Sequence, residues 1–217
     1  MKSHPKLAAA VVVLAASAVA GFALRAFAFD HPLTSTAIRD AYFLGNRNDE
    51  QTGEFLSQYI HSFPEPESGA YVQRIGIDTP FSQIIWHSRG KLNYFAPDAV
   101  EEFQNKRLPF LVHVEIALTE SYSPIPPASA PEYYQWVPDF WNDFEVKVVQ
   151  GKKEIPVEES RGGPIYAYGS NEIPIVTGAM IQLLYDPQKI KAEPVQVVVL
   201  TPDGRTVETT FDLAKLR

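Results

Sequence analysis

The sequence of 217 residues contains no cysteine. This absence excludes disulfides, thiolate metal ligands, thiol nucleophiles and a lipid-modified cysteine behind a leader. A chain without cross-links depends on its core for stability, and thirteen Phe, ten Tyr and three Trp supply bulky side chains for one. We therefore expect a domain that folds by hydrophobic packing alone.

The sequence also lacks the short motifs of common catalytic sites. It has no Gly-x-Ser-x-Gly elbow, no glycine-rich phosphate loop, no dinucleotide fingerprint and no His-Glu-x-x-His. A run of Asn and acidic residues at 46–50 resembles a calcium loop, but the required Gly and the final Glu are replaced by Gln51 and Ser57. We predict no catalytic residue, no cofactor and no metal site from these patterns.

Basic residues are scarce in this chain. It holds 19 Lys and Arg against 26 Asp and Glu, which gives a net charge of −7. Residues 1–28 carry three basic and no acidic side chains, so their removal takes the net charge to −10. Nucleic acids and anionic membrane surfaces bind basic faces, so we expect no nucleic-acid partner.

Residues 1–28 have the composition of a signal peptide. Lys2 and Lys6 precede an uncharged run over 7–24, and residues 26–28 form a small-x-small cleavage site. We expect an exported protein, periplasmic or extracellular. If residues 1–28 are retained instead, the 18 uncharged residues 7–24 form a short single-pass anchor and provide the membrane contact.

Residues 29–108 are predicted to be mainly helical, with one or two strands. Hydroxyl caps at 34–36 begin one helix, and Gly45-Asn46 is a stop signal for it. A second apolar stripe at helical spacing runs from Phe55 to Phe63. A strand is predicted over 69–78, with Tyr71, Gln73, Ile75 and Ile77 on one face. The segment from Pro80 to Trp86 fits a short helix or, nearly as well, a strand, and a further short helix begins at Ala96.

Residues 109–217 are predicted to form an antiparallel β-sandwich of immunoglobulin-like size. Alternation of apolar and polar residues marks strands at 110–119, 144–149, 154–157 and 179–185. Two further strands, 195–200 and 206–211, flank a Pro-Asp-Gly turn, and Gly162-Gly163-Pro164 is interpreted as another turn. The fold class is α+β, with an N-terminal helical pair and short helices packed on a C-terminal β-sandwich.

One histidine has an acidic neighbour on the same strand face. His113 and Glu115 are separated by one residue in the alternating strand at 110–119. Such a pair could be half of a metal site or an acid–base pair. Since zinc takes three or four ligands, a polar face on a half-buried strand explains the pair better.

The most unusual segment is 121–144, which carries five prolines and a dense set of aromatic residues. Prolines stiffen a long connection, and aromatic residues with polar tips suit recognition of sugars, peptides or a protein surface. The alternative is that the aromatic side chains cover the end of the core. Our candidates for binding a ligand or partner are Tyr133, Tyr134, Trp136, Phe140 and Trp141.

The favoured function from the sequence is a non-catalytic envelope protein that binds a partner protein or an extended ligand through this segment. The first alternative is an exported hydrolase of the glycoside type, whose carboxylates converge only in three dimensions. The second alternative is a membrane-tethered structural domain that keeps residues 7–24 as its anchor.

Overall fold

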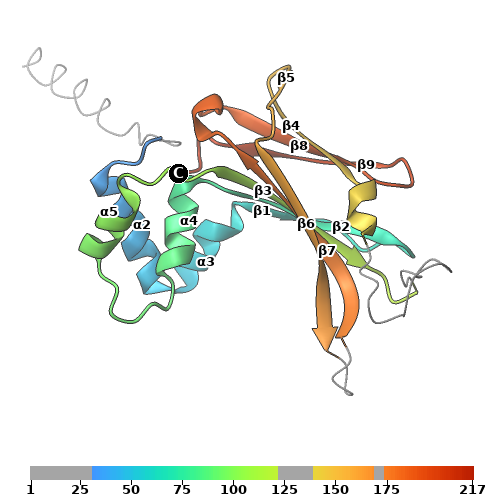
Figure 1. The fold of residues 1–217 in the computed structure, drawn as a ribbon, viewed down its shortest axis with the longest axis horizontal. Helices are drawn as coiled ribbons and strands as arrows, with labels where there is room; N and C mark the ends of the chain where they lie inside the picture. Colours follow the sequence, from blue (N-terminus) through green and yellow to red (C-terminus); the bar gives the residue numbers. More distant parts are fainter. Residues whose placement is uncertain (1–30, 122–138, 169–173) are drawn as a thin grey trace, which may run out of the picture.

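The computed structural model of the chain describes residues 31–121, 139–168 and 174–217. Within these ranges four α-helices gather at one end of the molecule, and two antiparallel sheets of five and four strands extend from them (Figure 1). The predicted α+β class with a β-sandwich is confirmed. The predicted leader lies outside the described residues.

Side-chain caps set the starts of three of the helices. α2 (Ser35–Arg47), α3 (Glu50–Ser57) and α4 (Pro80–Ser88) begin where Thr34, Asp49 and Thr79 accept a hydrogen bond from a backbone N–H of the first turn. α5 (Ala96–Phe103) begins with proline in its first turn. The hydroxyl cap predicted at 34–36 is thus in place at Thr34, and α2 packs mainly on α4 and α5 rather than on α3.

The predicted end of the first helix at Gly45 is wrong. Gly45 lies inside α2, where a Cβ atom would come within 2.3 Å of the carbonyl oxygen of Ile85 on α4. Glycine is present because α2 and α4 touch backbone to backbone at this point. The helix continues for two residues and ends at Asn48, which adopts the left-handed conformation.

The second helix is shorter than its apolar stripe predicts. α3 ends at Ser57, and the following residues form the short strand β1 (Ile60–Ser62). β1 pairs antiparallel with β2 (Ala70–Asp78), with Ile60 opposite Gly76. Tertiary pairing therefore overrides the helical periodicity of this segment.

The larger sheet has the strand order β1-β2-β3-β7-β6. β3 (Phe110–Leu118) lies at its centre, between β2 and the long strand β7 (Pro174–Tyr185). β6 (Glu159–Tyr168) forms one edge. Because β1 and β2 precede residue 109, the sheet spans the predicted division between the two regions.

The prediction of a turn at Gly162-Gly163-Pro164 is also wrong, since all three residues lie within β6. Glycine and proline disfavour central strands, but an edge strand tolerates a proline whose missing N–H would face away from the sheet. β6 is such an edge strand.

The smaller sheet has the strand order β5-β4-β8-β9. Its strands are β4 (Glu145–Gln150), β5 (Lys153–Glu154), β8 (Pro194–Leu200) and β9 (Thr206–Asp212). The predicted β8–β9 hairpin is confirmed, and Gly204 takes a positive φ of 80° in its turn. Two short 3₁₀ helices, η3 (Phe140–Asp143) and η4 (Pro187–Lys189), connect strands.

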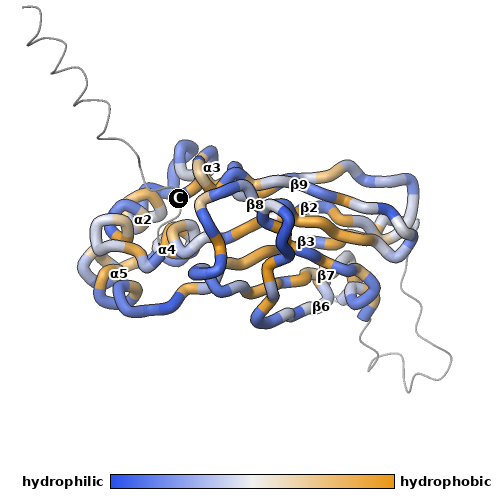
Figure 2. The backbone as a smooth tube through the Cα atoms, turned by 90° about the horizontal axis from the view of Figure 1, so that it is seen from above, coloured by the Kyte–Doolittle hydropathy of each residue, from blue (hydrophilic) through white to orange (hydrophobic). Residues whose placement is uncertain are grey.

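The main core lies between the two sheets, and a smaller one lies among the helices. Hydrophobic positions gather on β2, β3 and β7 in the middle of the molecule (Figure 2). Val112, Val114 and Ile116 of β3 point into the main core, so His113, Glu115 and their neighbours face outward. Because the helices pack at the end of the sandwich, this outer face stays partly accessible.

The described part of the chain contains no helix of sufficient length and apolarity to cross a membrane.

Candidate functional site

A hollow of about 730 Å³ opens on the outer face of the five-stranded sheet. It follows one row of paired residues across four strands. Tyr71 of β2 lies opposite Ala117 of β3, Ala117 lies opposite Gly178 of β7, and Gly178 lies opposite Ile165 of β6. The hollow therefore runs from the interior of the sheet to its β6 edge.

Two small residues form the floor of this hollow. Ala117 and Gly178 stand between the larger side chains of Tyr71 and Ile165. A Cβ atom at position 178 would come within 2.2 Å of the carbonyl oxygen of Ile116, so the strands can approach here only with glycine. The missing side chain at Gly178 thus permits the close pairing of β3 with β7 and also deepens the hollow.

A β-bulge brings Tyr71 to the hollow. The pairing of β2 with β3 shifts its register between Val72 and Arg74. The shift places Tyr71 on the outer face with Ala117, whereas Ile75 points into the main core. The prediction that Tyr71 and Ile75 share one face is therefore wrong, because strict alternation fails at the bulge.

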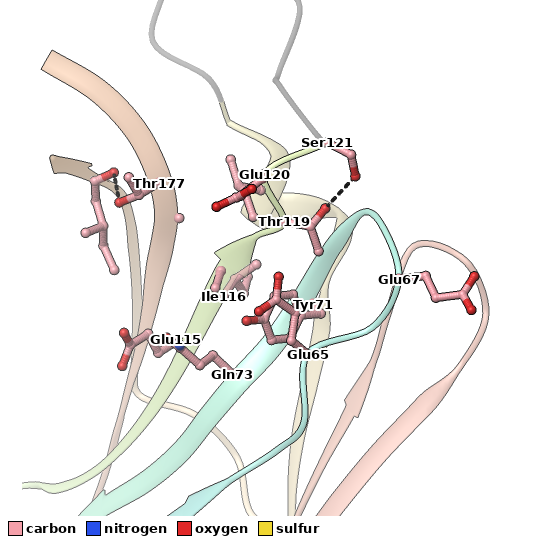
Figure 3. A pocket seen from close by; sticks show the side chains of 14 residues that line it. Glu65, Glu67, Tyr71, Gln73, Glu115, Ile116, Thr119, Glu120, Ser121 and Thr177 are labelled. Atoms are coloured by element: carbon pink, nitrogen blue, oxygen red, sulfur yellow. Dashed lines mark hydrogen bonds between the residues drawn. The ribbon is translucent and has the colours of Figure 1, made fainter. Parts of the chain in front are cut away.

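The charged residues that line the hollow are all acidic. Among the described residues around it, none is Lys, Arg or His, and four are carboxylates: Glu65, Glu67, Glu115 and Glu120. Figure 3 shows Tyr71 beside Glu65, with Glu67 pointing away from the other carboxylates. Burial, followed by the charges of Glu65 and Glu115, raises the pKa of the Tyr71 phenol. The four carboxylates give the lining an excess of negative charge, part of which Arg74 offsets through its ion pair with Glu115.

Short polar contacts fix the end of β3, which forms the rim of the hollow. The Thr119 hydroxyl accepts a hydrogen bond from the backbone N–H of Gly69 at 2.9 Å and lies 3.2 Å from the hydroxyl of Ser121. Arg74 approaches Glu115 from beside the hollow, at 3.6 Å. Ser121, the first residue of the Pro/aromatic segment, also lines the hollow (Figure 3).

His113 does not form a pair with Glu115. Its Nε2 atom lies 2.6 Å from Asp78, and Asp78 also accepts a hydrogen bond of 3.0 Å from the Ser82 hydroxyl. In a hydrolytic triad the histidine stands between the serine and the carboxylate, whereas here the carboxylate stands in the middle. Ser82 is fully buried near the start of α4, so this cluster ties α4 to the sheet.

No group of three or more His, Asp or Glu side chains in the described ranges is arranged to hold a metal ion.

Two of the five predicted binding residues lie in the described part of the chain. Phe140 and Trp141 of η3 are half-buried and pack against the main core. Trp141 lies against Gly162 of β6, where a Cβ atom would come within 2.3 Å of the indole Nε1. Tyr133, Tyr134 and Trp136 lie outside the described residues.

Few features of the sequence indicate the hollow. Glu65 lies between Pro64 and Pro66, Glu67 follows Pro66, and both have the sequence context of surface residues, while Ala117 and Gly178 carry no functional group. Their convergence depends on the register of four strands, which no motif encodes. Comparison of the chain with protein-family models and with curated proteins yields no match.

Proposed function

We propose that this chain is a non-catalytic exported protein that binds a positively charged, extended ligand, namely a segment of a partner protein in the cell envelope. The observation that carries the proposal is the acidic hollow at the foot of the Pro/aromatic segment. A concave site with ligand-binding dimensions and charged residues of one sign selects a ligand of the opposite sign.

The shape of the hollow supports an extended ligand. It crosses the sheet as a row with a floor of Ala117 and Gly178 and ends at the β6 edge. A side chain such as Lys or Arg can lie along such a row with its aliphatic part on the floor and its charge near the carboxylates. The net charge of −10 for residues 29–217 adds long-range attraction for the same ligand.

Binding requires only that the carboxylates surround the cation. Glycoside cleavage requires two carboxyl groups at a set separation of roughly 5–10 Å across one sugar ring. The four acids come from separate points, two before β2, one within β3 and one after it, and Glu67 points away from the others (Figure 3). Binding makes no demand on the separation of the acids, so the lining supports it without the paired geometry that the hydrolase alternative requires.

A charge-removal experiment tests the proposal. Trilysine is titrated into the protein and into the variant Glu65→Gln/Glu115→Gln, with thermal melts followed by tryptophan fluorescence. At about 100 times its Kd, a ligand adds roughly 2.7 kcal/mol to the free energy of unfolding, so the wild-type melt should rise visibly. The variant should show a much smaller rise, and salt should weaken the effect in the wild type.

The matched control removes two acids elsewhere. Glu54 of α3 and Glu193, next to β8, do not line the hollow. Glu54→Gln/Glu193→Gln should therefore keep the wild-type response. An equal response in all three proteins would mean diffuse charge attraction and would contradict the proposal. Turnover of chromogenic glycosides that depends on the same acids would favour the hydrolase instead.

A further inference from the structure

β6 is an unusually open sheet edge. It is ten residues long and, among the described residues, pairs on one side only, with β7. Proteins ordinarily protect edges by keeping them short or charged. The edges β1 and β5 have three and two residues, and the β9 edge carries Glu208 and Asp212.

The exposed half of β6 lacks such charges. No charged residue occurs from Gly162 to Tyr168, and Pro164 is the one protective feature in this run. Figure 1 shows that the far ends of β6 and β7 project from the body of the molecule. Large apolar side chains are accessible there: Tyr166 is 43 % exposed, Tyr168 77 % and Ile175 55 %.

The open edge and the acidic hollow meet at one residue. Ile165 belongs to β6 and also lines the hollow, in the same row as Gly178 and Ala117. A strand added to β6 would lie about 4.8 Å from it. An outward-facing side chain opposite Ile165 would then point along the row, over the small residues of the floor and toward the carboxylates.

We propose that the partner segment binds by adding a β-strand along β6 and that it places an Arg or Lys side chain over Ile165 into the acidic hollow. The proposal rests on the proposed function and specifies its partner: an extended polypeptide with alternating side chains and a basic residue on one face. Unpaired backbone groups supply the affinity of such strand addition, and the pocket for one side chain supplies the specificity.

Charge complementarity favours this occupant over a second copy of the chain. A second copy carries the same acidic excess, and the Arg161 that its β6 edge would bring is already held by Glu159 at 2.6 Å. A basic segment supplies the opposite charge at the place where the hollow opens to the edge. Pairing between copies is an outcome that the experiment below distinguishes.

The probe is a blocked peptide of nine residues that alternates Thr and Val and has Arg at its centre. Its binding to the purified protein is measured by fluorescence anisotropy, beside a peptide with central norleucine. Because a charge-assisted contact is involved, the Arg peptide should bind about tenfold more tightly. The variant Glu65→Gln/Glu115→Gln should abolish this preference, and Glu54→Gln/Glu193→Gln should retain it.

Backbone methylation tests the strand pairing itself. Two versions of the Arg peptide carry N-methyl groups on alternate residues, one on odd and one on even positions. In an antiparallel or parallel pair, alternate residues turn their backbone N–H groups toward the neighbouring strand. One version should therefore bind about tenfold more weakly or worse, and the other should bind nearly as well as the parent, since several hydrogen bonds are lost in one case only.

The remaining outcomes distinguish a failure of strand addition from a failure of the proposed cation site. If both methylated peptides bind like the parent and the Arg preference persists, strand addition is overturned while the proposed cation site stands. If methylation matters but the central residue does not, the link to the hollow is overturned, and the proposed function with it. Absence of peptide binding overturns the inference, as does a dimer in light scattering that Ala167→Lys dissociates.

Discussion

The indole of Trp141 packs directly on the backbone of Gly162. A Cβ atom on Gly162 would lie 2.3 Å from the indole Nε1, whereas nothing lies within 4 Å of the corresponding position on Gly163. The pair connects η3 to the β6 edge and closes this end of the core. It also explains why a strand contains a glycine at this point.

Gly162→Ala should therefore displace Trp141. We expect a loss of about 1–3 kcal/mol in the free energy of unfolding, because an inserted methyl group forces a packed side chain to move. Urea unfolding measures the loss, and a shift of tryptophan emission to longer wavelength reports the displaced indole. Gly163→Ala is the matched control and should change neither quantity by much. Equal effects of the two substitutions would contradict the packing described.

The contact between α2 and α4 supports a second prediction. Gly45→Ala places a methyl group against the Ile85 carbonyl oxygen, at 2.3 Å. The helices must separate, so we expect a loss of about 2 kcal/mol or more, as for other overpacked sites. Gly53 of α3 has nothing within 4 Å, so Gly53→Ala should stabilise the protein by up to about 1 kcal/mol through helix propensity. In thermal melts, the melting temperature should fall for Gly45→Ala and rise for Gly53→Ala.

The environment of Tyr59 makes the free energy of unfolding depend on pH in the alkaline range. Its hydroxyl donates a hydrogen bond of 2.8 Å to the carbonyl oxygen of Arg217, and burial raises the pKa of the phenol to about 12. The unfolded phenol loses its proton near pH 10. Between these values the folded state holds more protons, so the free energy of unfolding falls as pH rises.

The expected loss from this group is on the order of 2–3 kcal/mol between pH 10 and 12, and nothing below pH 9. Tyr59→Phe should lower stability at pH 7 by about 1 kcal/mol through the missing hydrogen bond. The variant should also show a shallower decline above pH 10, with the remaining slope due to other buried phenols such as Tyr185. An unchanged slope in denaturant titrations across this range would refute the assignment.

Filling the hollow tests its role without changing any charge. Ala117 is half-buried on the floor, so Ala117→Leu should fit the fold while it occupies the space of the ligand side chain. We expect binding of the Arg peptide to weaken about tenfold or more, since a blocked site loses both packing and charge contacts. Thr210→Leu adds the same side chain on the exposed face of β9 and should leave binding unchanged. Equal affinities in the two variants would place the ligand elsewhere.

Much of the fold follows from local patterns. The alternation in β3 fixes which residues face the core, and the Pro-Asp-Gly turn fixes the β8–β9 hairpin. Hydroxyl and carboxylate caps at Thr34, Asp49 and Thr79 set the helix starts. These features depend on neighbours in the sequence, so the sequence is sufficient to predict them.

The elements that are predicted incorrectly depend on contacts with residues that are distant in the sequence. Residues 60–62 belong to an apolar stripe with helical spacing, but they pair with β2 as a strand. Gly162 has the sequence context of a turn residue, but it lies in a strand and accommodates Trp141. Gly45 reads as a stop signal but serves a contact with α4. In each case a tertiary contact outweighs a preference of about 1 kcal/mol or less.

The candidate site is even harder to predict from the sequence. A bulge in β2 turns Tyr71 outward, and the row from Tyr71 to Ile165 combines four strands from three parts of the chain. A shift of one residue in any register would move the hollow or remove it. Only the Pro/aromatic segment 121–144 carries a recognisable compositional signal.

The most direct test of the binding site is an NMR titration of the ¹⁵N-labelled protein with the Arg peptide. If the peptide binds in the hollow, amide signals shift along one row and its rim, at Ala117, Gly178, Ile165 and Thr119, with the helices and β9 unchanged. The same titration of Glu65→Gln/Glu115→Gln should produce little change. Shifts that are confined to other surfaces, or that persist undiminished in the variant, would show that the peptide does not bind in the acidic hollow.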